Sequence, residues 1–155
     1  MPTGMIDTGT EQLLAEVRDG VALITLNRPA ARNALGDTIT PALRRQIRDR
    51  GADPDVRALL ITGAGDAFCA GGDVKAMGQR RAGSPLTRDE KISQLKERQR
   101  TLTGALTGLR KPTVAALPGP AAGAGLAIAS KMTAVPSWHH SFPRTARWVS
   151  LANVL

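Results

Sequence analysis

Two glycine-rich segments of this chain could place backbone N–H groups where chemistry needs them. The first, Phe68–Lys75 (FCAGGDVK), follows the apolar run RALLIT, and the second, Pro118–Gly125 (PGPAAGAG), follows the apolar run TVAAL. Where a strand gives way to a helix, the first N–H groups of the helix have no partner and carry partial positive charge. Two such groups aimed at one point would stabilise the negative oxygen of an enolate or a tetrahedral intermediate. Glycines also serve simply to make tight turns, but two such segments, each behind an apolar run, favour the chemical interpretation.

The elements that must position these segments can be predicted from local patterns. Two β-rich runs around Asp19-Gly20 predict a hairpin, and apolar side chains at helical spacing predict helices. We therefore expect an α/β chain with these elements in order: hairpin strands Leu13–Val17 and Val21–Leu26, a helix from Asp37 or Thr38 to Gly51, strand Arg57–Thr62, helix Arg88–Leu109, strand Thr113–Leu117 and helix Ala121–Ala129.

Composition excludes several classes of protein. With 155 residues, 42% apolar and 22% charged, the chain has the size and composition of one globular domain. The single cysteine, Cys69, excludes an internal disulfide framework and a zinc site of several cysteines, and it is better interpreted as a small buried side chain than as a nucleophile. We expect no bound metal. The chain has no run of about 18 apolar residues and no secretory signal pattern, so we expect a cytoplasmic protein without a membrane span.

The formal net charge of +8 is unevenly distributed. All 13 Asp and Glu lie before residue 98, whereas residues 98–155 carry seven Lys and Arg. These seven are scattered and form no dense patch that would neutralise phosphates, so we expect no nucleic-acid partner. Both histidines and three of the four aromatic residues lie in the last 18 residues. This shift in composition predicts a divergent basic tail, residues 131–155, after a core of residues 12–130.

Three blocks of sequence together resemble the crotonase, or enoyl-CoA hydratase/isomerase, superfamily. They are LITLNRPAARNAL (23–35), ALLITGAGDAFCAGGDVKAM (58–77) and KPTVAALPGPAAGAGLAIA (111–129), in the order and at the spacing of the family. The resemblance covers about residues 12–130, roughly the N-terminal half of the family's domain. It implies a spiral of ββα turns, incomplete at its C-terminus, that binds an acyl-CoA thioester, with coenzyme A as part of the substrate and no separate cofactor. It also implies a homo-oligomer, a trimer or a hexamer.

The resemblance further implies which residues form the site. The family holds the thioester carbonyl between two backbone N–H groups, which match Gly72 and Ala124 here. Most members have glycine at the second position, and alanine supplies the same N–H. Residues that match the coenzyme A channel or adjoin the two donors are expected to bind substrate: Ala31, Arg32, Ala34, Ala70, Gly71, Asp73, Val74, Pro120 and Gly123. For Asp73 and Lys75, charge at a helix N-terminus and at a solvated surface is an equally good interpretation.

The chain departs from the family where acid–base chemistry would be. The first of the hydratases' two glutamates falls at Ala127, and no Asp or Glu occurs after residue 97. His139 and His140 are poor substitutes, because adjacent histidines point in different directions and nothing nearby orients them. We therefore expect little activity from this chain. The reaction of an intact parent stays open among hydration, isomerisation, hydrolysis and decarboxylation.

The tail suggests an explanation for this departure. Trp148-Val149 must be encoded TGG-GTN, and a shift of one base reads glycine there, in a string that resembles a family segment. A frameshift after about residue 130 would account for the lost resemblance. A chain that binds acyl-CoA without turnover, or a protein-interaction module, is the main alternative. A nucleotide-binding module is disfavoured because Gly119, Gly123 and Gly125 do not form the G-x-G-x-x-G pattern.

Overall fold

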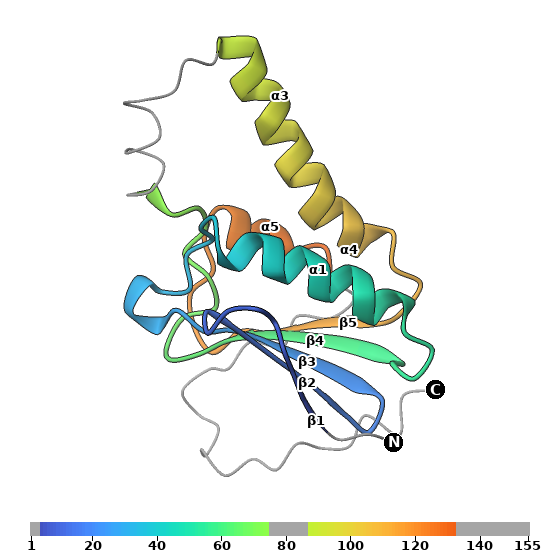
Figure 1. Ribbon diagram of the computed structural model, residues 1–155. Helices are drawn as coiled ribbons and strands as arrows, with labels where there is room; N and C mark the ends of the chain where they lie inside the picture. Colours follow the sequence, from blue (N-terminus) through green and yellow to red (C-terminus); the bar gives the residue numbers. More distant parts are fainter. Residues whose placement is uncertain (1–3, 75–86, 133–155) are drawn as a thin grey trace.

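The structure, a computed structural model, describes residues 4–74 and 87–132 (Figure 1). Its five strands form one mixed sheet in the order β1-β2-β3-β4-β5. The strands are β1 (Gly4–Ile6), β2 (Leu13–Arg18), β3 (Val21–Leu26), β4 (Ala58–Gly63) and β5 (Thr113–Ala116). The first three pair antiparallel, whereas β3, β4 and β5 pair parallel. Because parallel strands need a long crossover, helices occupy the connections between them.

The helical elements lie between and after these strands. They are the 3₁₀ turn η1 (Pro29–Ala31), α1 (Ile39–Ala52), α3 (Arg88–Gln99), the π-helical segment η2 (Arg100–Gly104), α4 (Ala105–Thr107) and α5 (Ala124–Ala129). Figure 1 shows α1 and α5 over the same face, while α3 projects away from the sheet. None of the helices in the described part of the chain is long and apolar enough to cross a membrane.

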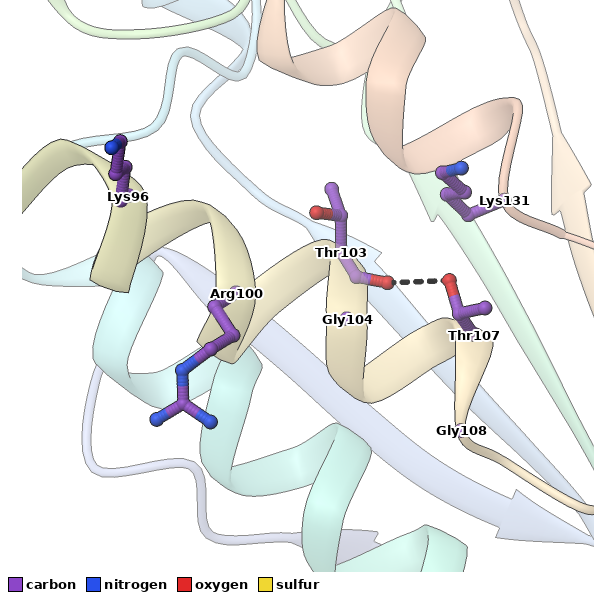
Figure 2. A pocket seen from close by; sticks show the side chains of 7 residues that line it. All are labelled: Lys96, Arg100, Thr103, Gly104, Thr107, Gly108 and Lys131. Carbon is purple, nitrogen blue, oxygen red and sulfur yellow. Dashed lines mark hydrogen bonds between the residues drawn. The ribbon is translucent and has the colours of Figure 1, made fainter.

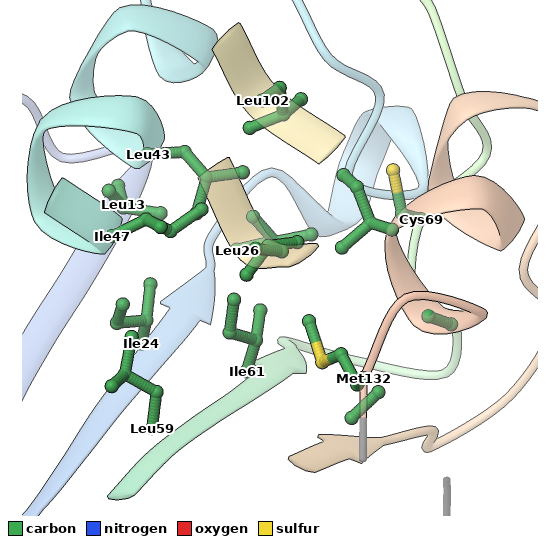
Figure 3. Close-up of a cluster of buried hydrophobic side chains, with 14 of the residues drawn as sticks. Leu13, Ile24, Leu26, Leu43, Ile47, Leu59, Ile61, Cys69, Leu102 and Met132 are labelled. Carbon is green, nitrogen blue, oxygen red and sulfur yellow. The ribbon is translucent and has the colours of Figure 1, made fainter. Parts of the chain in front are cut away.

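The hydrophobic core lies between the sheet and these helices, and Figure 3 shows its centre. Alternate residues of β3 point into it, as the period of a half-buried strand requires. The fully buried side chains include Leu13, Ile24, Leu26, Ile39, Leu43, Ile47, Leu59, Ile61, Phe68 and Ile128. On the opposite face of the sheet, Met5 and Leu14 remain exposed. The core therefore fixes α1 and α5 against the strand ends that carry the glycine-rich segments.

The predicted order of elements is confirmed, and so is the hairpin. Asp19 and Gly20 turn the chain with φ of 50° and 78°, and β2 pairs with β3 from Leu13–Leu26 to Arg18–Val21. The strand β1 was not predicted. Its three residues carry no pattern of their own, and they become a strand by pairing with β2.

Two predicted helices differ from the observed ones. The helix expected over Arg88–Leu109 changes to π geometry over Arg100–Gly104 and its last helical residue is Thr107. A π turn adds a residue to the helical period, so an apolar face cannot stay continuous through it. The helix expected from Ala121 begins at Ala124, because Ala121 instead lies on a bridge with Cys69.

Candidate functional site

Gly72, the first predicted donor, lies on an isolated parallel bridge with Leu35. The Leu35 N–H donates to the Gly71 carbonyl over 2.7 Å, and the Leu35 carbonyl accepts from the Asp73 N–H over 2.9 Å. Peptide groups alternate sides along an extended segment. Because the groups on both sides of Gly72 point to Leu35, the Gly72 N–H points the opposite way. Gly72 is an exposed residue, and its N–H has no hydrogen-bond acceptor among the described residues.

The second glycine-rich segment lies on the other side of the first. The Phe68 N–H donates to the Pro120 carbonyl over 3.0 Å, and the Ala122 N–H donates to the Cys69 carbonyl over 2.9 Å. The glycine-rich segment after β4 therefore lies between two others. The residues after β3 flank it on one side, and the residues after β5 flank it on the other. The two segments singled out by composition are thus direct neighbours.

Helix α5 begins at Ala124, the second predicted donor. The first N–H groups of a helix have no partner within it, and the Ala124 N–H has no acceptor elsewhere in the described residues. Gly123, directly before it, has φ of 52°, a conformation that glycine adopts without strain. A Cβ added to Gly71 would lie only 3.3 Å from the Ala124 nitrogen and 2.9 Å from the Ala122 carbonyl oxygen. The two turns therefore meet at Gly71, where no side chain would fit.

A residue that the sequence analysis did not single out holds these segments together. Asn33 is fully buried, with φ of 56°. Its Oδ1 accepts from the Arg28 N–H over 2.8 Å, and its Nδ2 donates to the Ala64 and Ala67 carbonyls over 2.9 and 2.8 Å. Asparagine is among the few residues that tolerate positive φ, which is the one local signal at this position. Asn33 thereby ties the segment after β3 to the loop after β4.

The predicted substrate-binding residues lie around these turns in different environments. The exposed ones are Ala31, Arg32, Ala70, Val74, Pro120 and Gly123. The Ala70 N–H donates to the Arg32 carbonyl over 2.9 Å, which brings the first two blocks together. Gly71 and Ala34 are buried, and Asp73 is half-buried and ion-paired with Arg28. Lys75, the two histidines and residues 133–155 of the predicted tail lie outside the described residues.

Cys69 is buried beside the site, as its interpretation as a small core side chain requires. Burial raises the pKa of the Cys69 thiol, and the Gly71 N–H, which donates to Sγ over 3.4 Å, opposes this in part. A Cβ added to Gly125 would lie 2.6 Å from Cys69 Cβ and 2.9 Å from its Sγ. The close packing of Gly125 on Cys69 therefore seats the first turn of α5 against the first glycine-rich segment.

The described residues around the two donors hold little that could transfer a proton. Ala127, at the place of the expected glutamate, is exposed on α5. Asp73 is engaged with Arg28 over 3.0 Å. In the part of the chain that the structure describes, no three His, Cys, Asp or Glu side chains gather as candidate metal ligands.

A hollow of about 630 Å³ lies away from the two donors, along α3, η2 and α4 (Figure 2). Its lining residues are Lys96, Arg100, Thr103, Gly104, Thr107, Gly108 and Lys131. Arg100 is paired with Glu97 over 2.9 Å, and the Thr107 hydroxyl donates to the Thr103 carbonyl over 3.0 Å. The hollow includes none of the predicted site residues and no carboxylate, so it is a cationic surface groove and not the candidate active site.

Solved structures with the same arrangement include proteins named as enoyl-CoA hydratases. A protein of Pseudomonas aeruginosa matches with a TM-score of 0.73 and 36% identity, over 81% of this chain and 52% of the solved one. An enoyl-CoA hydratase from a Polaromonas species matches with a TM-score of 0.71 and 30% identity, over 81% and 47% of the two chains. The chain therefore has the crotonase fold, of which it contains a part.

Sequence comparison gives the same class. The profile of the enoyl-CoA hydratase/isomerase family matches residues 21–135. A Mycobacterium tuberculosis protein named as a probable enoyl-CoA hydratase is 40% identical over 119 residues, 77% of this chain and 44% of that protein. A mitochondrial 3-hydroxyisobutyryl-CoA hydrolase of Rattus norvegicus is 37% identical over 78% of this chain and 31% of its own length. The chain belongs to the enoyl-CoA hydratase/isomerase family, and it spans less than half the length of these two relatives.

Proposed function

We propose that this chain binds an acyl-CoA thioester and holds the thioester carbonyl oxygen between the backbone N–H groups of Gly72 and Ala124. Such a pair of donors stabilises the negative oxygen of an enolate more than it stabilises the neutral carbonyl. The observation that carries the proposal is that Gly72 and Ala124 are exposed residues whose N–H groups have no acceptor among the described residues, and that their two turns meet at Gly71. The names of the relatives, an enoyl-CoA hydratase and a hydroxyacyl-CoA hydrolase, support the same substrate class.

We expect weak turnover, because alanine stands at the position of the expected glutamate and Asp73, the acid next to Gly72, is ion-paired with Arg28. Enolate formation needs a base at the α-carbon, and hydration needs a group that activates water. Ala127 supplies neither. We therefore expect crotonyl-CoA hydration far below the roughly 1–10³ s⁻¹ of ordinary enzymes. Trimeric or hexameric assembly and a frameshift after about residue 130 stay predictions, which light scattering and the coding DNA read in all frames would test.

The test is ¹³C NMR of butyryl-CoA labelled at the thioester carbonyl. Two hydrogen bonds to the oxygen polarise the carbonyl, so the labelled carbon should shift downfield when the chain is added. Ala124→Pro should abolish most of this shift, since proline lacks the N–H and is well tolerated at the first position of a helix. Ala124→Gly changes the same side chain and keeps the N–H, so it should behave as the natural chain does. No downfield shift with the natural chain, or an equal shift with Ala124→Pro, would refute the proposal.

A further inference from the structure

We propose that Arg28 and Asp73 form a positioning pair that fixes the direction of the Gly72 N–H. The inference rests on the proposed function, because it explains how one of the two donors is aimed. Arg28 Nη2 contacts Asp73 Oδ2 at 3.0 Å, and the two side chains are 21% and 19% exposed. Asp73 directly follows Gly72, and Arg28 lies 45 residues before it in the sequence.

The pair reinforces the bridge that orients Gly72. Arg28 Nη1 donates to the Ala34 carbonyl over 2.6 Å, while Nη2 reaches the Asp73 carboxylate. The guanidinium of Arg28 therefore binds both Ala34, which precedes Leu35, and Asp73, which follows Gly72. Between these two points lie the backbone hydrogen bonds that turn the Gly72 N–H away from Leu35. A lysine could meet the charge of Asp73, but it lacks the flat fork that serves both acceptors.

The surroundings hold Arg28 itself in place. Its backbone N–H donates to Asn33 Oδ1 over 2.8 Å, and its carbonyl accepts from the Asn33 N–H over 2.9 Å. Gly36 leaves room for the pair, since a Cβ there would lie 3.1 Å from Arg28 Nη1 and 3.6 Å from Asp73 Oδ2. We therefore infer that Asp73 acts indirectly, through Arg28 and the backbone. The family resemblance had instead implied that Asp73 contacts the substrate.

The experiment has one readout without ligand and one with it. In the ligand-free ¹⁵N-labelled chain, the heteronuclear NOE of the Gly72 amide reports its order on the ps–ns timescale. Asp73→Asn should lower this NOE toward that of a loose loop. With labelled butyryl-CoA, the same variant should reduce the downfield carbonyl shift by about half or more. A mobile Gly72 N–H makes a weaker hydrogen bond to the thioester oxygen than a fixed one does.

Matched variants separate positioning from general stability. Asp53→Asn breaks a comparable ion pair, Arg50–Asp53 at 2.7 Å with 22% and 24% exposure, at the far end of α1, and it should change neither readout. Gly36→Ala crowds the Arg28–Asp73 pair without removing a partner, so it should loosen Gly72 in the same direction. An unchanged Gly72 NOE in both Asp73→Asn and Gly36→Ala would overturn the inference whether or not ligand binds. A natural chain with an ordered Gly72 and no carbonyl shift would instead refute the proposed function.

Discussion

Replacement of Asn33 by alanine should be among the most damaging single substitutions in this chain. The side chain is fully buried and makes three hydrogen bonds of 2.8–2.9 Å, to the Arg28 N–H and to the Ala64 and Ala67 carbonyls. A net contribution of about 1 kcal/mol for each bond gives about 3 kcal/mol. Alanine at φ of 56° adds about 1 kcal/mol of backbone strain relative to asparagine.

The expected loss in the free energy of unfolding is therefore about 4 kcal/mol, a large share of the roughly 5–15 kcal/mol that holds an ordinary domain together. Asn33→Gly should lose about 3 kcal/mol, since glycine accepts the positive φ and only the hydrogen bonds are missing. Asn27→Ala is the matched control. Its Nδ2 donates to the Glu11 carbonyl over 2.8 Å at an exposed position, so its removal should cost about 1 kcal/mol or less.

Urea unfolding followed by far-UV circular dichroism measures these differences, provided the m-value stays constant across the series. The reasoning fails if Asn33→Ala loses less than about 1.5 kcal/mol, because three buried hydrogen bonds would then contribute almost nothing. It also fails if Asn33→Gly is more destabilised than Asn33→Ala, because the backbone conformation would then not matter.

Further outcomes follow from the same contacts. Gly125→Ala should destabilise the chain by about 1–3 kcal/mol through overpacking on Cys69, whereas Gly104→Ala, with its nearest neighbour 3.9 Å away, should stabilise it by about 0.5–1 kcal/mol, both read from urea midpoints. The buried Cys69 thiol, whose pKa burial raises, should react with iodoacetamide at least about 100-fold more slowly in the folded chain than in urea. Hydrogen bonds from Thr87 lower the pKa of Glu90, so its support of the first turn of α3 is complete above its ordinary pKa and is lost as pH falls through the lowered value. Amide exchange at that turn should therefore accelerate in acid, and Glu90→Gln should remove most of the pH dependence.

Elements fixed by neighbouring residues could be predicted from the sequence. The β2–β3 hairpin needs only its Asp19-Gly20 turn and alternating side chains, and both are local. The π segment in the long helix could not be predicted, because it depends on how α4 meets the core. Leu102 and Leu106 are buried there, whereas Ile92 is 41% exposed on the projecting part of α3.

The candidate site divides in the same way. Gly72 and Ala124 were reached through glycine-rich segments behind strands and through the family resemblance, and both lie at turns that meet. The structural role of Asn33 was not predicted, because its partners Ala64 and Ala67 are 31 and 34 residues away and no local pattern indicates these contacts. An asparagine in a turn is compatible with many roles, and only the contacts in the folded chain show which role Asn33 has.

The three blocks of resemblance are one physical unit, and this explains how binding and catalysis could separate in this chain. Each block contributes one of three adjacent segments, and the contacts among them are mostly backbone hydrogen bonds and glycine packing. The one carboxylate that we propose to help, Asp73, acts on the Gly72 N–H through Arg28 and the backbone, not by transferring a proton. By contrast, the resemblance implies that the first of the hydratases' two glutamates would stand on the surface of α5, at the position of Ala127. Because replacing that glutamate by alanine leaves the backbone hydrogen bonds among the three segments in place, we expect this chain to lose turnover without losing the proposed carbonyl site.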